Sequence, residues 1–337
     1  MATEHIRVVA RVRPALVREQ GVEEVVEVAR DAVVVDHSGT SRKSYKFGFD
    51  RAFPPSATQD EVYDFLQPLI RSVCGGFNST IFAYGRELRG VGEGGGEGRR
   101  RERCRAREKE PRPFVRLALT FTSCSPRTPQ PPETGTGKTH TMLGADLWDL
   151  ASARPGDLQQ EAFEQPENWG VIPRAVRDIF DFCEKEERAG TTFRVTVSYL
   201  EIYNEQVYDL LRLGQEQGEG FETERIALAV RTDQRQGTFV PGAAVVLVES
   251  EDDVLELLWT GAQNRAISAT DMNEHSSRSH TVFQLVVEEE EVAEGDDPER
   301  LPRRGKLNLV DLAGSEKWKS HQLAEFSDKR IQELTSM

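Results

Sequence analysis

Residues 134–142 read Thr134-Gly135-Thr136-Gly137-Lys138-Thr139-His140-Thr141-Met142. This is the composition of a phosphate-binding loop that continues into a helix, because small residues let backbone N–H groups turn toward a nucleotide phosphate. Lys138 would reach the β- and γ-phosphate oxygens, and the hydroxyl of Thr139 would bind Mg²⁺. The N-terminus of the following helix would point its positive end at the phosphates. The stretch therefore predicts a site for a nucleotide and its magnesium ion.

One position of the loop departs from this pattern. The pattern has a glycine four residues before Thr136, where this chain has Pro132. The preceding segment, residues 86–133, is rich in arginine, glycine and proline and has neither helical nor strand periodicity. We expect it to be a disordered or foreign insert that displaces Gly85, the first glycine of the loop. A basic tract that binds an acidic surface is the weaker alternative.

The composition excludes several classes of protein. The chain has 337 residues, enough for one large or two small domains. Its net charge of −14 argues against a nucleic-acid-binding protein as a whole. No apolar run approaches the roughly 20 residues of a membrane-spanning helix, so we expect no membrane span. The four cysteines are widely spaced, which favours reduced thiols in the cytoplasm over a zinc site.

Hydrophobic periodicity predicts strands that alternate with helices. The expected strands are residues 6–12, 79–85, 193–203, 226–230, 244–248, 281–287 and 306–310. The expected helices are residues 59–74, 173–188 and 250–269, with a single helical turn at 207–211. This alternation around a phosphate-binding loop predicts an α/β fold with a mostly parallel or mixed sheet and helices on both faces. Ligands in such a sheet bind beyond the carboxyl ends of the strands.

Two further segments carry residues suited to nucleotide chemistry. The apolar run 307–310 leads into Asp311, at the place where proteins with such a loop keep the carboxylate that holds Mg²⁺ through water. Gly314 follows three residues later and is small enough for its N–H to approach a γ-phosphate. Residues 273–280 place hydroxyl groups and a guanidinium on a loop, as a nucleotide-sensing segment requires.

Together these segments resemble the kinesin motor domain. Asn273-Glu274-His275-Ser276-Ser277-Arg278-Ser279-His280 is similar to that family's switch I, and Asp311-Leu312-Ala313-Gly314-Ser315-Glu316 is similar to its switch II. Shorter motifs in the family's order are Arg11-Val12-Arg13-Pro14, Phe49-Asp50, Ile81-Phe82-Ala83-Tyr84-Gly85 and Tyr199-Leu200-Glu201-Ile202-Tyr203-Asn204. The resemblance covers the chain except residues 86–133, residues 145–168 and about the last dozen. It implies the P-loop NTPase-type kinesin fold over residues 4–337.

The resemblance also implies cofactors, partners and site residues. The cofactors would be ATP and Mg²⁺, and the partner would be the microtubule, which places the protein on the cytoskeleton in the cytoplasm. The residues that it implies for cofactor binding are Arg11, Pro14, Gly85, Thr134, Gly135, Thr136, Gly137, Lys138, Thr139, His140, Ser277 and Gly314. Among these, Arg11, Pro14 and His140 would flank the adenine. The metal would be held by Thr139, Ser277 and Asp311.

The catalytic residues implied by the resemblance are Glu316, Arg278, Ser276 and Lys138. Ser276 would contact the attacking water. Arg278 and Glu316 would form the salt bridge that closes when ATP is bound, and Glu316 would relay the proton of the water. The alternatives are that Arg13 or Arg11 is a plain surface charge and that Arg278 and Glu316 form an ordinary surface pair.

The chain departs from the family in two places. Residues 86–133 stand where kinesins have a single Gln, and we expect a retained intron whose removal restores Gly-Gln-Thr-Gly-Thr-Gly-Lys-Thr. The chain ends soon after Glu316, where the family continues into its main microtubule-binding elements and neck. We therefore expect an incomplete microtubule-facing surface, and dimerisation only through a stalk outside this chain.

Two interpretations of the function remain open. The first is an ATP-hydrolysing microtubule motor domain for microtubule-based movement. The alternative is a non-catalytic kinesin-like binding module with a disrupted P-loop. A GTPase is disfavoured, because the sequence has no Asn-Lys-x-Asp motif to bind guanine.

Overall fold

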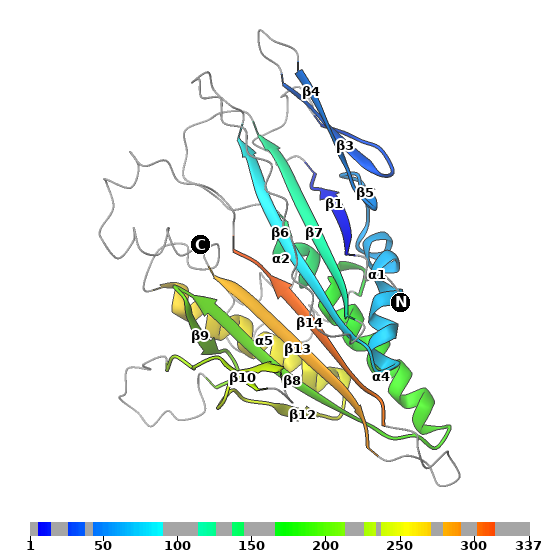
Figure 1. Ribbon diagram of the computed structural model, residues 1–337, viewed down its shortest axis with the longest axis vertical. Coiled ribbons are helices and arrows are strands. Elements are labelled where there is room, and N and C mark those ends of the chain that lie inside the picture. The colour runs from blue at the N-terminus through cyan, green and yellow to red at the C-terminus, as the bar shows by residue number, and fades with distance from the viewer. Residues whose placement is uncertain are drawn as a thin grey trace.

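The central element of the fold is a nine-stranded sheet (Figure 1). The computed structural model describes residues 6–14, 26–37, 43–89, 114–125, 137–144, 166–212, 226–233, 237–270, 279–290 and 302–313. The strands lie in the order β12-β8-β13-β14-β6-β7-β1-β5, with β9 also paired to β8. Their bounds in that order are Val246–Val248, Phe193–Tyr203, His280–Glu289, Arg304–Asp311, Asn78–Arg89, Phe114–Ser125, Arg7–Val12 and Arg51–Phe53, with β9 at Gln206–Asp209.

The sheet is mixed, as the sequence predicted. Strands β14, β6, β7, β1 and β5 run parallel, whereas β12, β8, β13 and β14 pair antiparallel. Burial alternates strictly along β13, because successive side chains of a strand point to opposite faces. The parallel strand β14 ends at Asp311, so the candidate metal-binding carboxylate lies at the carboxyl edge of the sheet.

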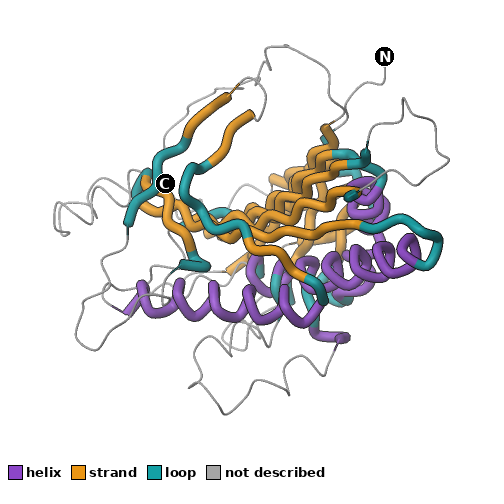
Figure 2. Tube along the Cα trace, turned by 90° about the horizontal axis from the view of Figure 1, so that it is seen from below, coloured by secondary structure: helices purple, strands orange, loops and turns teal. Residues whose placement is uncertain are grey.

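The described helices pack together on one face of this sheet (Figure 2). They are α1 (Gln59–Cys74), α2 (Lys138–Met142), α4 (Val171–Glu187) and α5 (Glu251–Thr270), with a 3₁₀ turn η2 at Pro166–Asn168. Helix α4 contacts α1, α2 and α5, and all four share one hydrophobic core with the sheet. The sequence predicted helices on both faces of the sheet, whereas the described helices all lie on this one face. Among the described helices, none is long and apolar enough to cross a membrane.

Helix α1 shows how the sequence fixes one of these elements locally. Thr58 accepts a hydrogen bond from the N–H of Glu61, and the Glu61 carboxylate accepts one from the N–H of Thr58, so the first turn is capped from both sides. Val62, Leu66 and Ile70 follow at helical spacing and are almost fully buried. The apolar face of α1 therefore packs on the sheet next to β14 and β6.

The insert contains a strand, which corrects the expectation of a segment without structure. Residues 114–125 form β7, which lies between β6 and β1 and is parallel to both (Figure 1). Strand β6 also runs on to Arg89 and does not end at Gly85. The sequence Phe114-Val115-Arg116-Leu117-Ala118-Leu119-Thr120-Phe121-Thr122 is rich in residues that favour strands, and the glycine- and proline-rich flanks obscured it. Residues 90–113 and 126–133 lie outside the described part of the chain.

A second difference concerns residues 207–211, where the sequence predicted a turn of helix. The structure has strand β9 here, because the chain reverses at Asn204 and Glu205, both of which have positive φ angles. A two-residue turn of this kind joins antiparallel strands, and Tyr203 pairs directly with Gln206. The small sheet β2-β3-β4 (Val26–Val28, Ala32–His37, Lys43–Gly48) lies where the sequence predicted only a strand-and-turn segment to about Lys46. The hairpin β10-β11 (Arg231–Asp233, Gly237–Phe239) was not predicted.

Candidate nucleotide-binding site

The candidate site is built where helix α2 meets the carboxyl end of β14. The hydroxyl of Thr139 donates a hydrogen bond of 2.9 Å to Oδ2 of Asp311, although the two residues are 172 positions apart. Gly137 precedes the helix with a φ angle of +83°, a left-handed conformation that favours glycine. The structure thus joins the two motif residues that the sequence predicted to share a magnesium ion.

The surroundings of Asp311 fit a hydrated magnesium ion. Its Oδ1 atom is buried and has no hydrogen-bond partner among the described residues, and the guanidinium of Arg265 lies 4.0 Å from Oδ2. Carboxylate and hydroxyl oxygens are the ligands that Mg²⁺ prefers, and the ion usually completes its shell with water and substrate phosphates. Among the described residues there is no group of three or more acidic, histidine or cysteine side chains that could hold a metal ion.

Arg265 and Glu201 extend the site, although the sequence predicted neither of them as a site residue. The Nε atom of Arg265 on α5 lies 3.7 Å from Oε1 of Glu201 on β8, and both side chains are almost completely buried. Arg265 also donates to the hydroxyl and the carbonyl of Ser279 at 3.2–3.3 Å. A signal existed in the helical spacing of Leu258, Ala262 and Arg265, because an arginine on a buried helix face needs a charged partner.

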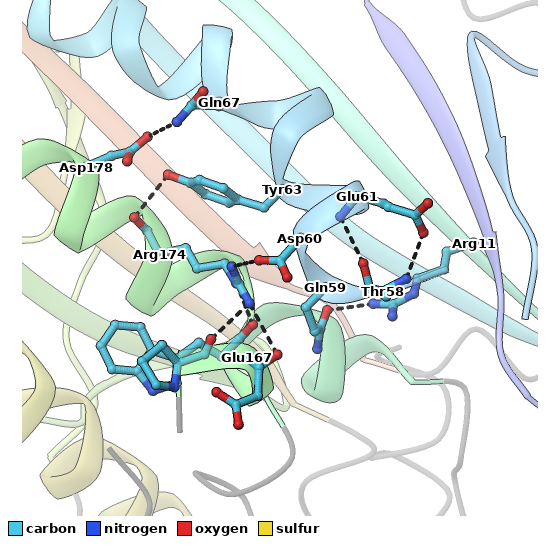
Figure 3. A network of polar contacts seen from close by, with 12 residues as sticks. Arg11, Thr58, Gln59, Asp60, Glu61, Tyr63, Gln67, Glu167, Arg174 and Asp178 are labelled. Carbon is cyan, nitrogen blue, oxygen red and sulfur yellow. Dashed lines mark hydrogen bonds and ion pairs between the residues drawn. The ribbon is translucent and has the colours of Figure 1, made fainter. Parts of the chain in front are cut away.

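Arg11 is buried and is not a plain surface charge. Its guanidinium donates to Gln59 at 2.8 Å (Figure 3). It also donates to Thr141 at 2.7 Å and to the carbonyl of Ala57 at 3.2 Å. Burial lowers the pKa of Arg11 to about 10. Gln59 in turn donates to the backbone carbonyl of His140 at 2.7 Å. Arg11 therefore ties the start of α1 to α2, the helix that carries His140.

The structure links two of the three residues that are predicted to flank the adenine. Pro14 is exposed and its carbonyl accepts a hydrogen bond of 2.8 Å from Arg13. Arg11 and His140 are linked through Gln59, as described above. The role of these three residues toward adenine stays a prediction.

Gly85 lies inside a strand in this chain. It is paired with Phe121 of β7, in the middle of a register that continues to Arg89 opposite Ser125. A P-loop needs the chain to turn at this glycine, and here it runs straight on. Of the other predicted residues, Thr134, Gly135, Thr136, Ser276, Ser277, Arg278, Gly314 and Glu316 lie outside the described residues.

A second polar network holds the carboxyl end of α2. Arg174 on α4 forms an ion pair with Asp60 on α1 and donates to the carbonyls of Pro166 and Trp169 at 2.9 and 2.8 Å (Figure 3). The indole ring of Trp169 lies under the guanidinium of Arg177, 4.1 Å from its carbon. Trp169 itself pairs with Gly144, just beyond α2. The helix that carries Lys138 and Thr139 is thus held at its carboxyl end by α1 and by the segment that leads into α4.

Comparisons with known proteins identify the relatives of this chain. The family model described as the kinesin motor domain matches residues 11–91 and 133–337, and the gap in that match falls within residues 86–133. The chain is 34% identical over 320 residues to the kinesin-like protein Klp61F of Drosophila melanogaster, which covers 94% of this chain and 24% of that protein. It is 32% identical over 317 residues to the kinesin-like protein KIN-5B of Oryza sativa subsp. japonica, which covers 93% of this chain and 24% of that protein. The chain thus spans about a quarter of these relatives.

Solved structures give the same result for the fold. The structure of a fast kinesin superposes with a TM-score of 0.67 at 29% sequence identity, covering 99% of this chain and 71% of that chain. The C-terminal motor and motor homology domain of Kar3Vik1 superposes with a TM-score of 0.65 at 25% identity, covering 98% of this chain and 65% of that chain.

Proposed function

The chain belongs to the kinesin motor domain family, and from this premise we propose that it binds Mg·ATP and supplies the ATP-hydrolysing part of a microtubule motor. The observation that carries the proposal is the hydrogen bond of 2.9 Å between Thr139 and Asp311. It brings the hydroxyl of the phosphate-binding helix to the carboxylate at the end of β14, which is the pair that a P-loop NTPase uses for its magnesium ion.

Each residue of the site has a distinct task in this proposal. Lys138 binds the β- and γ-phosphate oxygens, while Thr139 and Asp311 hold the magnesium ion together with Ser277. When bound, Mg²⁺ neutralises charge on the phosphate oxygens. Arg11, Pro14 and His140 enclose the adenine, and Gly314 offers its N–H to the γ-phosphate.

Hydrolysis itself is assigned to the two switch segments. Ser276 orients the attacking water, and Glu316 takes up its proton. The ion pair between Arg278 and Glu316 forms only when the loop closes over ATP, so water is activated only in the closed state. Because the chain spans about a quarter of its curated relatives, movement along microtubules, dimerisation through a stalk and a location on cytoplasmic microtubules are proposed for the whole protein.

One observation favours the alternative function, a non-catalytic kinesin-like module. Gly85 is held in β6 by its pairing with β7, and a glycine in a straight strand does not start a phosphate-binding turn.

We propose that residues 86–133 are a retained intron and that the mature protein has Gly85 joined to Thr134 through one Gln. The match of the family model on both sides of this segment supports that proposal.

The first experiment is amplification of cDNA across the codons for Gly85 and Thr134. We expect a cDNA product that is shorter than the genomic interval, because the intron has been removed. The encoded protein would then have a continuous phosphate-binding loop. If the only product retains the whole segment, the non-catalytic function is favoured.

The second experiment measures nucleotide binding directly. The full chain and a form in which one Gln replaces residues 86–133 are titrated with a fluorescent ATP analogue in the presence of Mg²⁺. We expect the Gln-bridged form to bind at least tenfold more tightly, and Lys138→Ala in that form to abolish binding. If the Gln-bridged form binds no nucleotide, the proposed function is wrong.

A further inference from the structure

His280 makes a hydrogen bond that connects the two predicted switch segments. It is the first residue of β13, and its Nδ1 atom accepts the backbone N–H of Ala313 at 2.8 Å, 33 positions further along the chain. Only a neutral imidazole with its proton on Nε2 can accept at Nδ1. Burial of the ring lowers the pKa of His280, which keeps it in that neutral form.

The backbone that leaves β14 is held from two sides. The N–H of Leu312 donates to the carbonyl of Ala83 on β6 at 3.0 Å, so the first residue after Asp311 is fixed by a neighbouring strand. The next N–H, that of Ala313, is fixed by His280. The first bond joins two backbone groups and does not depend on a side chain. The second depends on one side chain, and Ala313 is only 5% exposed, so water does not easily replace it.

His280 is itself firmly placed. Its backbone is paired with Ile202 on β8. The preceding residue, Ser279, is fully buried and accepts hydrogen bonds from Arg265. Arg265 also faces Asp311 at 4.0 Å. The end of the loop 273–280 is therefore attached to β8 and α5, and it reaches across to Ala313 through the imidazole ring.

We propose that His280 is a positioning residue that sets the path of the backbone after Asp311, so that the N–H of Gly314 meets the γ-phosphate of ATP. The inference rests on the proposed nucleotide-binding function and deepens it, because it assigns to His280 the discrimination between ATP and ADP. Since ADP has no γ-phosphate, loss of the bond between His280 and Ala313 weakens the binding of ATP and leaves the binding of ADP unchanged.

The test compares His280→Ala, His280→Gln and His280→Asn, each in the full chain and in the Gln-bridged form. The Asn carbonyl oxygen falls near the place of Nδ1 and can accept the Ala313 N–H, whereas the polar end of Gln falls near the place of Nε2. A non-hydrolysable ATP analogue and ADP are titrated separately with Mg²⁺. Hydrogen exchange of the peptide that contains Ala313 reports the bond itself.

We expect His280→Ala and His280→Gln to bind the ATP analogue about tenfold more weakly, as the loss of one buried hydrogen bond implies. Their ADP affinity stays at the native value, and the Ala313 amide exchanges faster. His280→Asn retains both affinities and the protection of Ala313.

Two results overturn the inference while the proposed function stands. Native affinity for the ATP analogue in His280→Ala and His280→Gln shows that the bond does not position the backbone. Equal losses for ATP and ADP in all three variants show a purely structural role. If neither the full chain nor the Gln-bridged form binds any nucleotide when His280 is unchanged, the proposed function fails, and this inference fails with it.

Discussion

Arg265 and Glu201 form an ion pair within the core, between helix α5 and strand β8, with 3.7 Å between Nε and Oε1 and almost no exposure of either residue. Removing one partner of such a pair leaves a buried charge without compensation, which typically costs about 3–5 kcal/mol. We therefore expect Arg265→Ala to lower the free energy of unfolding by about that amount. Chemical denaturation measures the change.

The matched control for this prediction is Arg188→Ala. Arg188 pairs with Glu184 on the surface of α4, with both side chains more than half exposed. Exposed pairs contribute about 0–1 kcal/mol. Equal losses in the two variants would show that the Arg265 pair has no special weight.

Gly261 leaves no room for a larger residue. A Cβ atom at this position would lie 2.2 Å from the ring of Tyr199, which itself packs edge-on against Phe283 at 5.3 Å. We expect Gly261→Ala to displace the ring and to lower the melting temperature by several degrees, because overpacking a core costs about 1–3 kcal/mol. Gly48→Ala meets nothing within 4 Å, and an equal decrease in that variant would refute the argument.

Substitution of Asp311 should weaken the part of ATP binding that depends on magnesium and leave metal-free nucleotide binding unchanged. We expect Asp311→Asn in the Gln-bridged form to weaken Mg²⁺-dependent ATP binding about tenfold or more, because a neutral amide holds a magnesium shell less well than a carboxylate. Binding measured in EDTA should then be the same in the native and variant proteins. A difference that persists in EDTA would mean that Asp311 acts only through the fold.

Arg303 joins the β13–β14 hairpin to the end of α4. It pairs with the fully buried carboxylate of Glu289 at 3.1 Å and with Glu186 at 2.9 Å, and it lies over the ring of Phe193. We expect Arg303→Ala to lower the free energy of unfolding by about 2–4 kcal/mol, since it removes the guanidinium from a buried acid.

The neighbouring residue provides the control for Arg303. Arg304 pairs with Glu288 at 3.3 Å, but this pair is largely exposed. Arg304→Ala should change stability by less than about 1 kcal/mol. Chemical denaturation of the two variants measures both changes. A larger loss of stability in Arg304→Ala than in Arg303→Ala would contradict the role given to Arg303.

The thiols of the α1–α4 layer should react slowly. Burial raises the pKa of Cys74 to about 12 and that of Cys183 to about 11. Because the thiolate is the reactive form, a raised pKa leaves little of it near pH 8, and reactivity increases as the pH rises. We expect iodoacetamide to modify Cys183 before Cys74 in the folded protein, as mass spectrometry of the peptides would reveal. Rapid modification of Cys74 below pH 8 would show that α1 opens readily.

The sequence could predict those features whose signals lie within a few neighbouring residues. Helix α1 follows from the helical spacing of apolar residues within 59–74, which the structure buries against the sheet. The alternation of residues 281–287 predicted β13, and the apolar run before Asp311 predicted β14. The glycines, Lys138 and Thr139 predict a phosphate-binding loop from local signals of the same kind. That loop stays a prediction, because residues 134–136 lie outside the described part of the chain.

Only the tertiary structure determined which distant groups meet. Because the chain reverses at Asn204 and Glu205, the residues expected to form a helical turn pair with β8 as strand β9. Residues 114–125 form a strand because they pair with both β6 and β1. The partners of Arg265 and the bond from Ala313 to His280 depend on strand order and register across many residues. Periodicity and capping are local properties of a chain, whereas a buried charge or an N–H group at the end of a strand finds its partner only after the sheet has assembled.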